Sequence, residues 1–160
     1  MSEAEQLIAR LALEKHPEGG WFKRIHTSEQ VLDTAFGARA RVTSIHYLLT
    51  VDEPLGRLHR NRSDILHYLQ GGGPVEYLLL DEAGDLRRVV LGHAPDQQLF
   101  LFVPGGVWKA SRLIGEAGHA LVSEAVVPGF DFADHAFADT ALGERFPQHR
   151  ELLKPFLRQT

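Results

Sequence analysis

Two glycine-led segments with a period of two constrain the fold of this chain most strongly. Residues 56–71 (GRLHRNRSDILHYLQG) and 92–111 (GHAPDQQLFLFVPGGVWKAS) each begin with a glycine and then alternate polar and apolar residues. Side chains two positions apart lie on the same face of a β-strand, so this alternation is typical of strands that are half buried. Both segments are therefore predicted to be β-structure with one face turned inward.

The same period indicates which side chains share a face. One face of the first segment carries His59, Asn61, Ser63, Ile65, His67 and Leu69. In the second segment, Pro104-Gly105-Gly106 predicts a tight turn, after which Val107, Lys109 and Ser111 share a face. Histidines and a lysine on inward faces are the first candidates for a functional site.

The rest of the chain predicts more strands at regular spacing, with turn signals between them. These strands are expected at residues 21–27, 41–50, 75–80, 86–91, 99–103, 107–111 and 119–127. Residues 28–40 form a polar connection with room for a short strand pair. Such spacing favours a closed or sandwiched all-β architecture.

Helices are predicted only at the two ends of the chain. Ser2 and Glu5 form a capping box ahead of apolar residues at helical spacing, which predicts a helix over 2–15. Pro147 is expected to begin a short helix that runs to about Leu157. No repeat, low-complexity tract or linker divides the chain, so residues 1–160 are predicted to form one domain.

Composition excludes several classes of function. The 160 residues carry a net charge of −4 with no basic run, so we expect no nucleic-acid partner. No apolar stretch approaches the roughly 18 residues of a membrane span, and no signal-peptide core begins the chain. We therefore expect a cytoplasmic protein without a membrane partner. The absence of cysteine excludes disulfides and thiolate metal sites.

The nine histidines fall into two groups. His16, His135 and His149 are predicted to be solvated, because they lie in expected helix ends or loops. His46, His59 and His67 lie within strand patterns instead. Two interpretations stay open for the segment after His16: its aromatic residues pack in the core, or Glu18, Trp21 and Arg24 line the mouth of the barrel.

Four longer motifs resemble one family. They are His16-Pro-Glu-Gly-Gly-Trp-Phe22, Arg62-Ser63-Asp64 with His67, Val103-Pro-Gly-Gly-Val-Trp108, and Pro128-Gly-Phe-Asp-Phe-Ala-Asp134. Together they resemble the DUF985, or cupin 5, branch of the cupin superfamily. The resemblance implies an RmlC-like jelly-roll β-barrel that usually dimerises, similar to sugar-nucleotide epimerases that work without a metal. The resemblance predicts the fold better than it predicts a reaction.

The cupin resemblance also implies four metal-ligand positions, and three of them lack a normal ligand here. These positions fall on His59, Asn61, Ile65 and Lys109. Isoleucine and a protonated lysine cannot bind a transition metal, so we expect no metal or other cofactor. A different triad that recruits His67 and Glu124 remains an alternative. Where the family commonly has Glu and Arg-Glu, this chain has Ile65 and Arg24-Ile25, so an activity that needs those acids is in doubt.

Three functions are consistent with this sequence. The first is a metal-independent epimerase, isomerase or lyase that acts on a small anionic or carbonyl-containing molecule, with His59 as base, His67 or Glu124 as its partner, and Lys109 facing the enolate oxygen. In an alternative for two of these residues, Glu124 is simply the salt-bridge partner of Lys109.

The second function is a non-catalytic binding module, and the third is a metal-dependent oxygenase or isomerase. The residues expected to contact the ligand are Trp21, Arg24, His46, Tyr47, Tyr68, Asn61 and Ser63. We also expect a homodimer, because Leu66 and Trp108 are predicted to be apolar on the outer face; terminal helices that cover them are the alternative.

Overall fold

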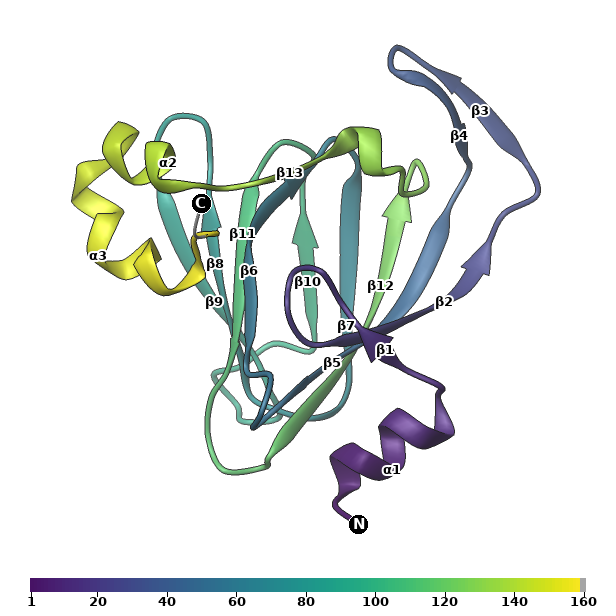
Figure 1. The fold of residues 1–160 in the computed structure, drawn as a ribbon, viewed down its shortest axis with the longest axis vertical. Coiled ribbons are helices and arrows are strands. Elements are labelled where there is room, and N and C mark those ends of the chain that lie inside the picture. Colours follow the sequence, from purple (N-terminus) through teal and green to yellow (C-terminus); the bar gives the residue numbers. More distant parts are fainter. Residues whose placement is uncertain (159–160) are drawn as a thin grey trace.

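The computed structural model describes residues 1–158 as two antiparallel sheets that pack face to face, with short helices at either end (Figure 1). The six-stranded sheet has the order β1–β2–β5–β12–β7–β10 and contains β1 (Glu14–Lys15), β2 (Trp21–Thr27), β5 (Thr43–Thr50), β12 (His119–Val127), β7 (Asp64–Gly72) and β10 (Phe100–Val103). The five-stranded sheet has the order β13–β6–β11–β8–β9 and contains β13 (His135–Phe137), β6 (Leu55–Asn61), β11 (Trp108–Leu113), β8 (Val75–Leu80) and β9 (Leu86–Leu91). This arrangement confirms the predicted all-β jelly roll.

Three details refine that prediction. The two sheets face each other without joining into one hydrogen-bonded cylinder. The connection at 28–40 does hold a strand pair, β3 (Val31–Thr34) with β4 (Gly37–Ala40), which projects from the body of the molecule (Figure 1). None of the helices within residues 1–158 is both long enough and apolar enough to cross a membrane.

The interior between the sheets is largely apolar. Its buried side chains include Tyr47, Leu49, Leu69, Leu79, Val89, Leu101 and Val122, which come from both sheets. Burying a large apolar side chain contributes about 1.5–3 kcal/mol. A polar group in this interior must therefore find a partner or lower the stability of the fold.

The first glycine-led segment is two strands rather than one. It breaks after Asn61, whose Oδ1 accepts a hydrogen bond of 3.1 Å from the Ser63 amide, and the chain then crosses to the other sheet. His59 and His67 lie eight positions apart in the sequence, and both remain buried on either side of this turn. Consequently the two histidines face the interior from opposite sheets, and not from one strand as the alternation predicted.

The terminal helices are shorter than predicted. Helix α1 (Glu3–Arg10) has the expected capping box between Ser2 and Glu5, but it ends early, and Ala12 follows with a φ of 51°. The predicted helix over 147–157 is broken into α3 (Arg150–Leu153) flanked by 3₁₀ turns. An additional helix, α2 (Thr140–Arg145), precedes it and is capped by Asp139.

The C-terminal helices cover the outer face of the five-stranded sheet. Trp108 lies 7% exposed in an apolar cluster with Leu58, Leu142, Leu153 and Phe156. The prediction that Trp108 is an exposed outer residue is therefore wrong, and the alternative in which terminal helices cover it is correct. One of the two residues that motivated a homodimer no longer supports it.

Candidate functional site

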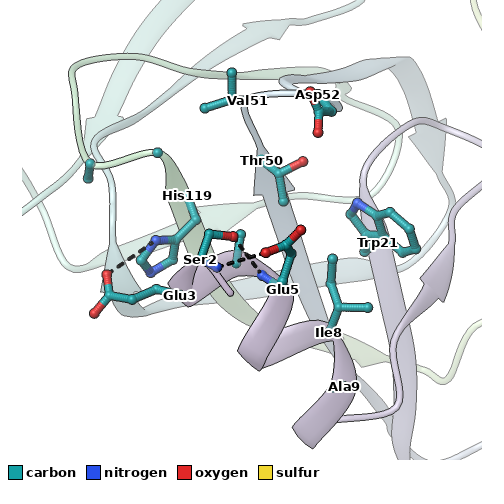
Figure 2. A pocket seen from close by; sticks show the side chains of 13 residues that line it. Ser2, Glu3, Glu5, Ile8, Ala9, Trp21, Thr50, Val51, Asp52 and His119 are labelled. Carbon is teal, nitrogen blue, oxygen red and sulfur yellow. Dashed lines mark hydrogen bonds and ion pairs between the residues drawn. The ribbon is translucent and has the colours of Figure 1, made fainter.

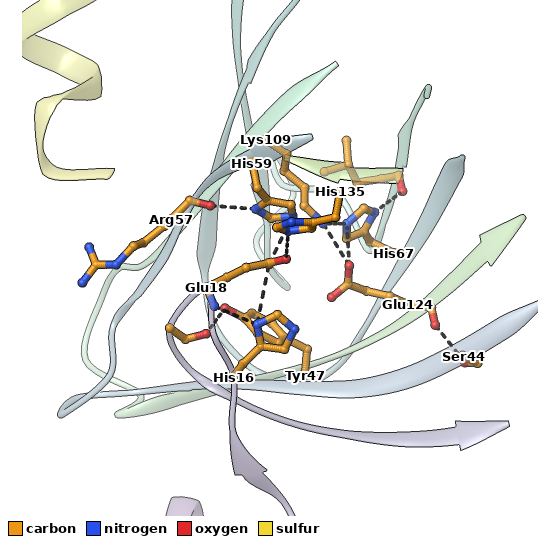
Figure 3. Close-up of polar contacts among 12 residues, drawn as sticks. His16, Glu18, Ser44, Tyr47, Arg57, His59, His67, Lys109, Glu124 and His135 are labelled. Carbon is orange, nitrogen blue, oxygen red and sulfur yellow. Dashed lines mark hydrogen bonds and ion pairs between the residues drawn. The ribbon is translucent and has the colours of Figure 1, made fainter. Parts of the chain in front are cut away.

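Polar side chains gather in the interior as two neighbouring clusters (Figure 3). We call His67, Lys109 and Glu124 the lysine cluster, and Glu18, His59 and His135 the histidine cluster. Lys109 on β11 pairs directly with His59 on β6, so the two residues share a face of the five-stranded sheet. Glu124 on β12 pairs directly with His67 on β7 in the opposite sheet.

The lysine cluster joins the two sheets. Lys109 Nζ crosses the interior and donates to Glu124 Oε1 at 2.9 Å and to His67 Nε2 at 2.7 Å. His67 Nδ1 lies 3.1 Å from the Leu101 carbonyl oxygen, which can only accept, so the His67 proton resides on Nδ1 and Nε2 is free to accept from the lysine. All three side chains are thereby satisfied.

Electrostatics keep the lysine cluster in one protonation state. Burial and the charge of Lys109 lower the pKa of His67, so His67 is neutral. Burial would raise the pKa of Glu124, but Lys109 and His67 overcome that effect and hold it well below its usual value. Glu124 is therefore the salt-bridge partner of Lys109, the alternative that the sequence left open.

The histidine cluster is built from three separate parts of the chain. Glu18 Oε2 lies 3.1 Å from His59 Nε2, and Glu18 Oε1 accepts a hydrogen bond of 2.9 Å from His135 Nε2. The two imidazole rings are stacked, with centroids 5.3 Å apart. His135 is placed by β13, where it pairs with Asn61 at the end of β6.

A glycine pair positions Glu18. The Arg57 amide donates to the Glu18 carbonyl at 2.7 Å, and the Tyr47 hydroxyl donates to the Gly19 carbonyl at 2.6 Å. Gly19 and Gly20 have φ values of 98° and 78°, and a Cβ on Gly19 would lie 2.2 Å from the Leu55 carbonyl oxygen. Only glycine fits a turn pressed this closely against the sheet. The Glu-Gly-Gly sequence thus directs the carboxylate inward.

The histidine cluster carries an uncompensated negative charge. Burial would raise the pKa of Glu18, but His59, which is protonated at the low pH where Glu18 titrates, and the His135 hydrogen bond lower it to about 2. Burial lowers the pKa of His59 to about 4, so at neutral pH His59 is uncharged beside a carboxylate. His59 Nδ1 lies 2.7 Å from the Arg57 carbonyl oxygen and must donate to it. The Nε2 lone pair therefore points at Glu18.

Two of the histidines predicted to be solvated belong to this interior network, so that prediction is wrong for them. The His135 side chain is 6% exposed and is surrounded by Phe130, Phe132 and Phe137. His16 Nδ1 accepts from the Glu18 amide at 3.0 Å, and burial lowers the pKa of His16. The third, His149, lies outside this network and is part buried, with its Nε2 2.7 Å from the Gly84 carbonyl oxygen.

Four of the predicted ligand-contacting residues lie near these clusters. Tyr47 is buried, with its hydroxyl hydrogen bonded to the turn that carries Glu18. Asn61 and Ser63 are buried where β6 ends, and Asn61 uses its oxygen to stabilise the turn. Arg24 is exposed, with its guanidinium 5.9 Å from the Phe130 ring. These residues stay candidates for ligand contacts.

Three others lie outside the interior. Trp21 faces a groove of about 610 Å³ between helix α1 and the end of the six-stranded sheet (Figure 2). His46 lies on the outer face, 3.2 Å from Ser123 Oγ, and lines a groove with His119. Tyr68 is 44% exposed and packs against Phe100. The expectation that these three share a pocket with Lys109 is therefore not met.

The positions implied by the cupin motifs do not form a metal site. Ile65 offers no ligand atom, the Asn61 oxygen accepts from Ser63, and the Lys109 ammonium is bound by Glu124. Sequence reasoning named Glu18 only as a possible mouth residue and dismissed His135. The available signal was the Glu-Gly-Gly turn for Glu18, whereas nothing local marked His135 as inward facing.

The chain is similar to proteins from several organisms. Residues 5–138 match the model of the family described as Cupin superfamily (DUF985). The uncharacterized protein YML079W of Saccharomyces cerevisiae is 38% identical over 152 residues, which covers 85% of this chain and 75% of the yeast protein. A hypothetical protein from Leishmania major superposes with a TM-score of 0.90 at 32% identity and covers 99% of this chain and 100% of its own.

More distant structures share the fold alone. Oxalate decarboxylase from Bacillus subtilis has a TM-score of 0.58 at 15% identity, with 89% of this chain and 36% of that chain covered. A dTDP sugar isomerase from Desulfovibrio desulfuricans has a TM-score of 0.51 at 17% identity, with 72% and 82% covered. The family match spans most of the sequence, and the two sheets have the jelly-roll arrangement. The chain therefore belongs to the DUF985 family of the cupin superfamily.

Proposed function

We propose that the protein binds a small carbonyl-containing molecule between its two sheets and moves a proton next to the carbonyl, as an epimerase, isomerase or lyase does. The observation that carries this proposal is the geometry of His59, whose ring is buried, with Nδ1 2.7 Å from the Arg57 carbonyl oxygen; burial lowers its pKa to about 4. Its Nε2 lone pair is held in the interior, where a general base is needed.

Glu18 supports this role better than the partners that the sequence suggested. Once Nε2 takes a proton, the carboxylate oxygen 3.1 Å away would accept a hydrogen bond from it and stabilise the imidazolium. His67 is unsuited to be the partner, because its own lone pair accepts from Lys109. Glu124 is occupied by the same lysine.

The charge of the interior bears on the substrate. The two clusters together contain two carboxylates and one ammonium, which gives a net charge of −1 while the histidines are neutral. A neutral carbonyl compound is therefore favoured over an anion unless an additional cation is bound.

A non-catalytic binding module is the second candidate. It is favoured by the lysine cluster, whose groups are all engaged with one another and leave Lys109 no free proton for an enolate oxygen. In this version the interior recognises a ligand without transforming it.

Proton exchange with solvent separates the two candidates. A panel of sugars, 2-oxo acids and nucleotide sugars in D₂O should include a compound that gains deuterium next to its carbonyl, as followed by NMR. His59→Gln should abolish the exchange, while His26→Gln, on an exposed part of β2, should leave it unchanged. A compound that binds without any exchange would favour the non-catalytic binding module over the enzyme.

A further inference from the structure

The histidine cluster places two electron-rich atoms against each other. His59 Nδ1 donates to the Arg57 carbonyl, so Nε2 is the nitrogen turned toward the Glu18 carboxylate, and in the neutral ring this atom carries the lone pair. That lone pair lies 3.1 Å from an oxygen of the Glu18 carboxylate. Two acceptors at this distance repel each other unless a proton or another cation lies between them.

We propose that Glu18, His59 and His135 bind one divalent transition-metal ion, through a carboxylate oxygen and the two Nε2 atoms. The three ligand atoms all lie within 4.8 Å of one another. A carboxylate with two imidazoles is a ligand set that suits zinc and divalent iron, manganese or cobalt. Tetrahedral bonds of about 2.0–2.2 Å place ligand atoms roughly 3.4 Å apart. Both Glu18 oxygen–nitrogen distances are already below this value, at 3.1 and 2.9 Å, so small movements of the three side chains suffice.

The surroundings of the cluster support a metal ligand role. Histidine ligands commonly donate their second nitrogen to a backbone carbonyl, which fixes the tautomer, and His59 already does so with Arg57. Glu18 is fixed by a backbone turn that its two glycines permit. The aromatic rings around His135 provide an apolar shell that limits access of water to the site.

Lys109 opposes a cation at this place only in part, because its ammonium is paired with Glu124. The sequence argument against a metal rested on a free ammonium at a ligand position, but that ammonium is bound by Glu124 at 2.9 Å. The proposed donors also differ from the four motif positions, since only His59 is common to both. Glu18 comes from the turn before β2 and His135 from β13. A divalent ion would change the net charge of the interior from −1 to +1, which would favour an anionic carbonyl compound.

Metal binding itself can be tested without any substrate and does not rest on the proposed proton transfer. Protein treated with a chelator and desalted should bind one Co²⁺ per chain, seen as a visible absorption band, and one Zn²⁺ by competition with a metal indicator. Glu18→Gln and His135→Gln should each weaken the affinity by roughly 100-fold or more, since even outer-shell changes cost 10–100-fold. His26→Gln is the matched control and should bind normally.

Two outcomes would overturn this site. One is the absence of stoichiometric binding to the folded wild-type protein, with ¹⁵N NMR showing His59 protonated on both nitrogens at pH 7. The other is stoichiometric binding that survives Glu18→Gln and His135→Gln, which would place the ion elsewhere. The deuterium-exchange assay tests the proposed function separately and is run on the metal-free protein, because an ion bound to His59 Nε2 would take the lone pair that the base needs. Metal binding without exchange by the metal-free protein would leave the site standing and remove the proposed enzyme activity.

Discussion

The lysine cluster and the histidine cluster combine the same kinds of group with opposite results. Each holds one buried carboxylate and two nitrogen side chains, and each includes a histidine whose Nδ1 is engaged by a backbone carbonyl. In both clusters a histidine Nε2 lies 3.1 Å from a carboxylate oxygen, but in the lysine cluster an ammonium donates to both of these atoms. In the histidine cluster no cation occupies the corresponding place among the described residues 1–158. One residue thus separates a charge-compensated internal bridge from the cluster for which we propose metal binding.

The largest expected effect comes from removing the lysine of the first cluster. Lys109→Met should lower the free energy of unfolding by roughly 3 kcal/mol at pH 8, because Glu124 is then left buried without its counter-charge. The loss should shrink at pH 6, where His67 can take up a proton and replace the missing cation. Urea unfolding at both pH values measures this difference.

The double variant Lys109→Met/Glu124→Leu is the control for that experiment. Removing both charges together should recover most of the lost stability, since a buried ion pair can be replaced by apolar groups at little cost. If the double variant were as unstable as Lys109→Met, packing of the lysine stem rather than charge would explain the loss.

A smaller loss is expected when the turn that carries Glu18 is disturbed. Gly19→Ala should cost about 1–3 kcal/mol, because Gly19 has a positive φ and its new Cβ would meet the Leu55 carbonyl. It should also weaken Co²⁺ binding by moving the carboxylate. Gly118→Ala is the matched control, since Gly118 also has a positive φ, of 82°, but nothing lies within 4 Å of its Cβ position.

Gly118→Ala is expected to lose less stability and to bind Co²⁺ as the wild type does. Equal effects of the two substitutions in thermal unfolding and in Co²⁺ titration would show that backbone strain alone matters. They would also show that the turn does not position Glu18.

The sequence predicted the strands well. It also predicted the residues of the lysine cluster, but it missed part of the histidine cluster for a physical reason. The two-residue period directs His59, His67, Lys109 and Glu124 inward without any knowledge of tertiary structure. It says nothing about which inward residues meet across the interior. His135 lies on a three-residue strand that pairs with β6 only in the folded chain, so no local period could reveal that its ring faces Glu18. The contact between His135 and Glu18 was therefore beyond sequence reasoning, whereas the Lys109–Glu124 pair could be given only as one alternative.

Stability should also depend on pH through the lysine cluster. The pKa of His67 is lowered in the fold from its ordinary value of 6.5, so the unfolded chain binds a proton that the folded chain does not as pH falls below about 6.5. The contribution of His67 to the free energy of unfolding is therefore fully present above that pH and decreases below it. The slope is about 1.4 kcal/mol per pH unit for each such proton.

Glu124 adds to the loss with the same sign. Its pKa in the fold lies well below its ordinary value of 4.5, so its contribution is present above pH 4.5 and is lost as pH falls further. Unfolding titrations between pH 8 and 3 should show both regions. His67→Gln should reduce the slope of the upper one without removing it, because burial also lowers the pKa values of His59 and His16. Equal slopes for wild type and His67→Gln between pH 6.5 and 5 would mean that His67 is protonated in the fold.

The smallest effect on stability is expected from Glu18→Gln in the histidine cluster. The same Glu→Gln change in the lysine cluster, at Glu124, should be costly. With a chelator present, Glu18→Gln should change the free energy of unfolding by less than about 0.5 kcal/mol, since its amide can donate to His59 Nε2 while its oxygen still accepts from His135. Glu124→Gln should instead cost roughly 3 kcal/mol, because it leaves the Lys109 ammonium buried without a counter-charge. Urea unfolding of both variants at pH 7.5 compares the clusters directly. Equal losses would mean that His59 carries a second proton in the native state, so that Glu18, like Glu124, is already paired with a cation.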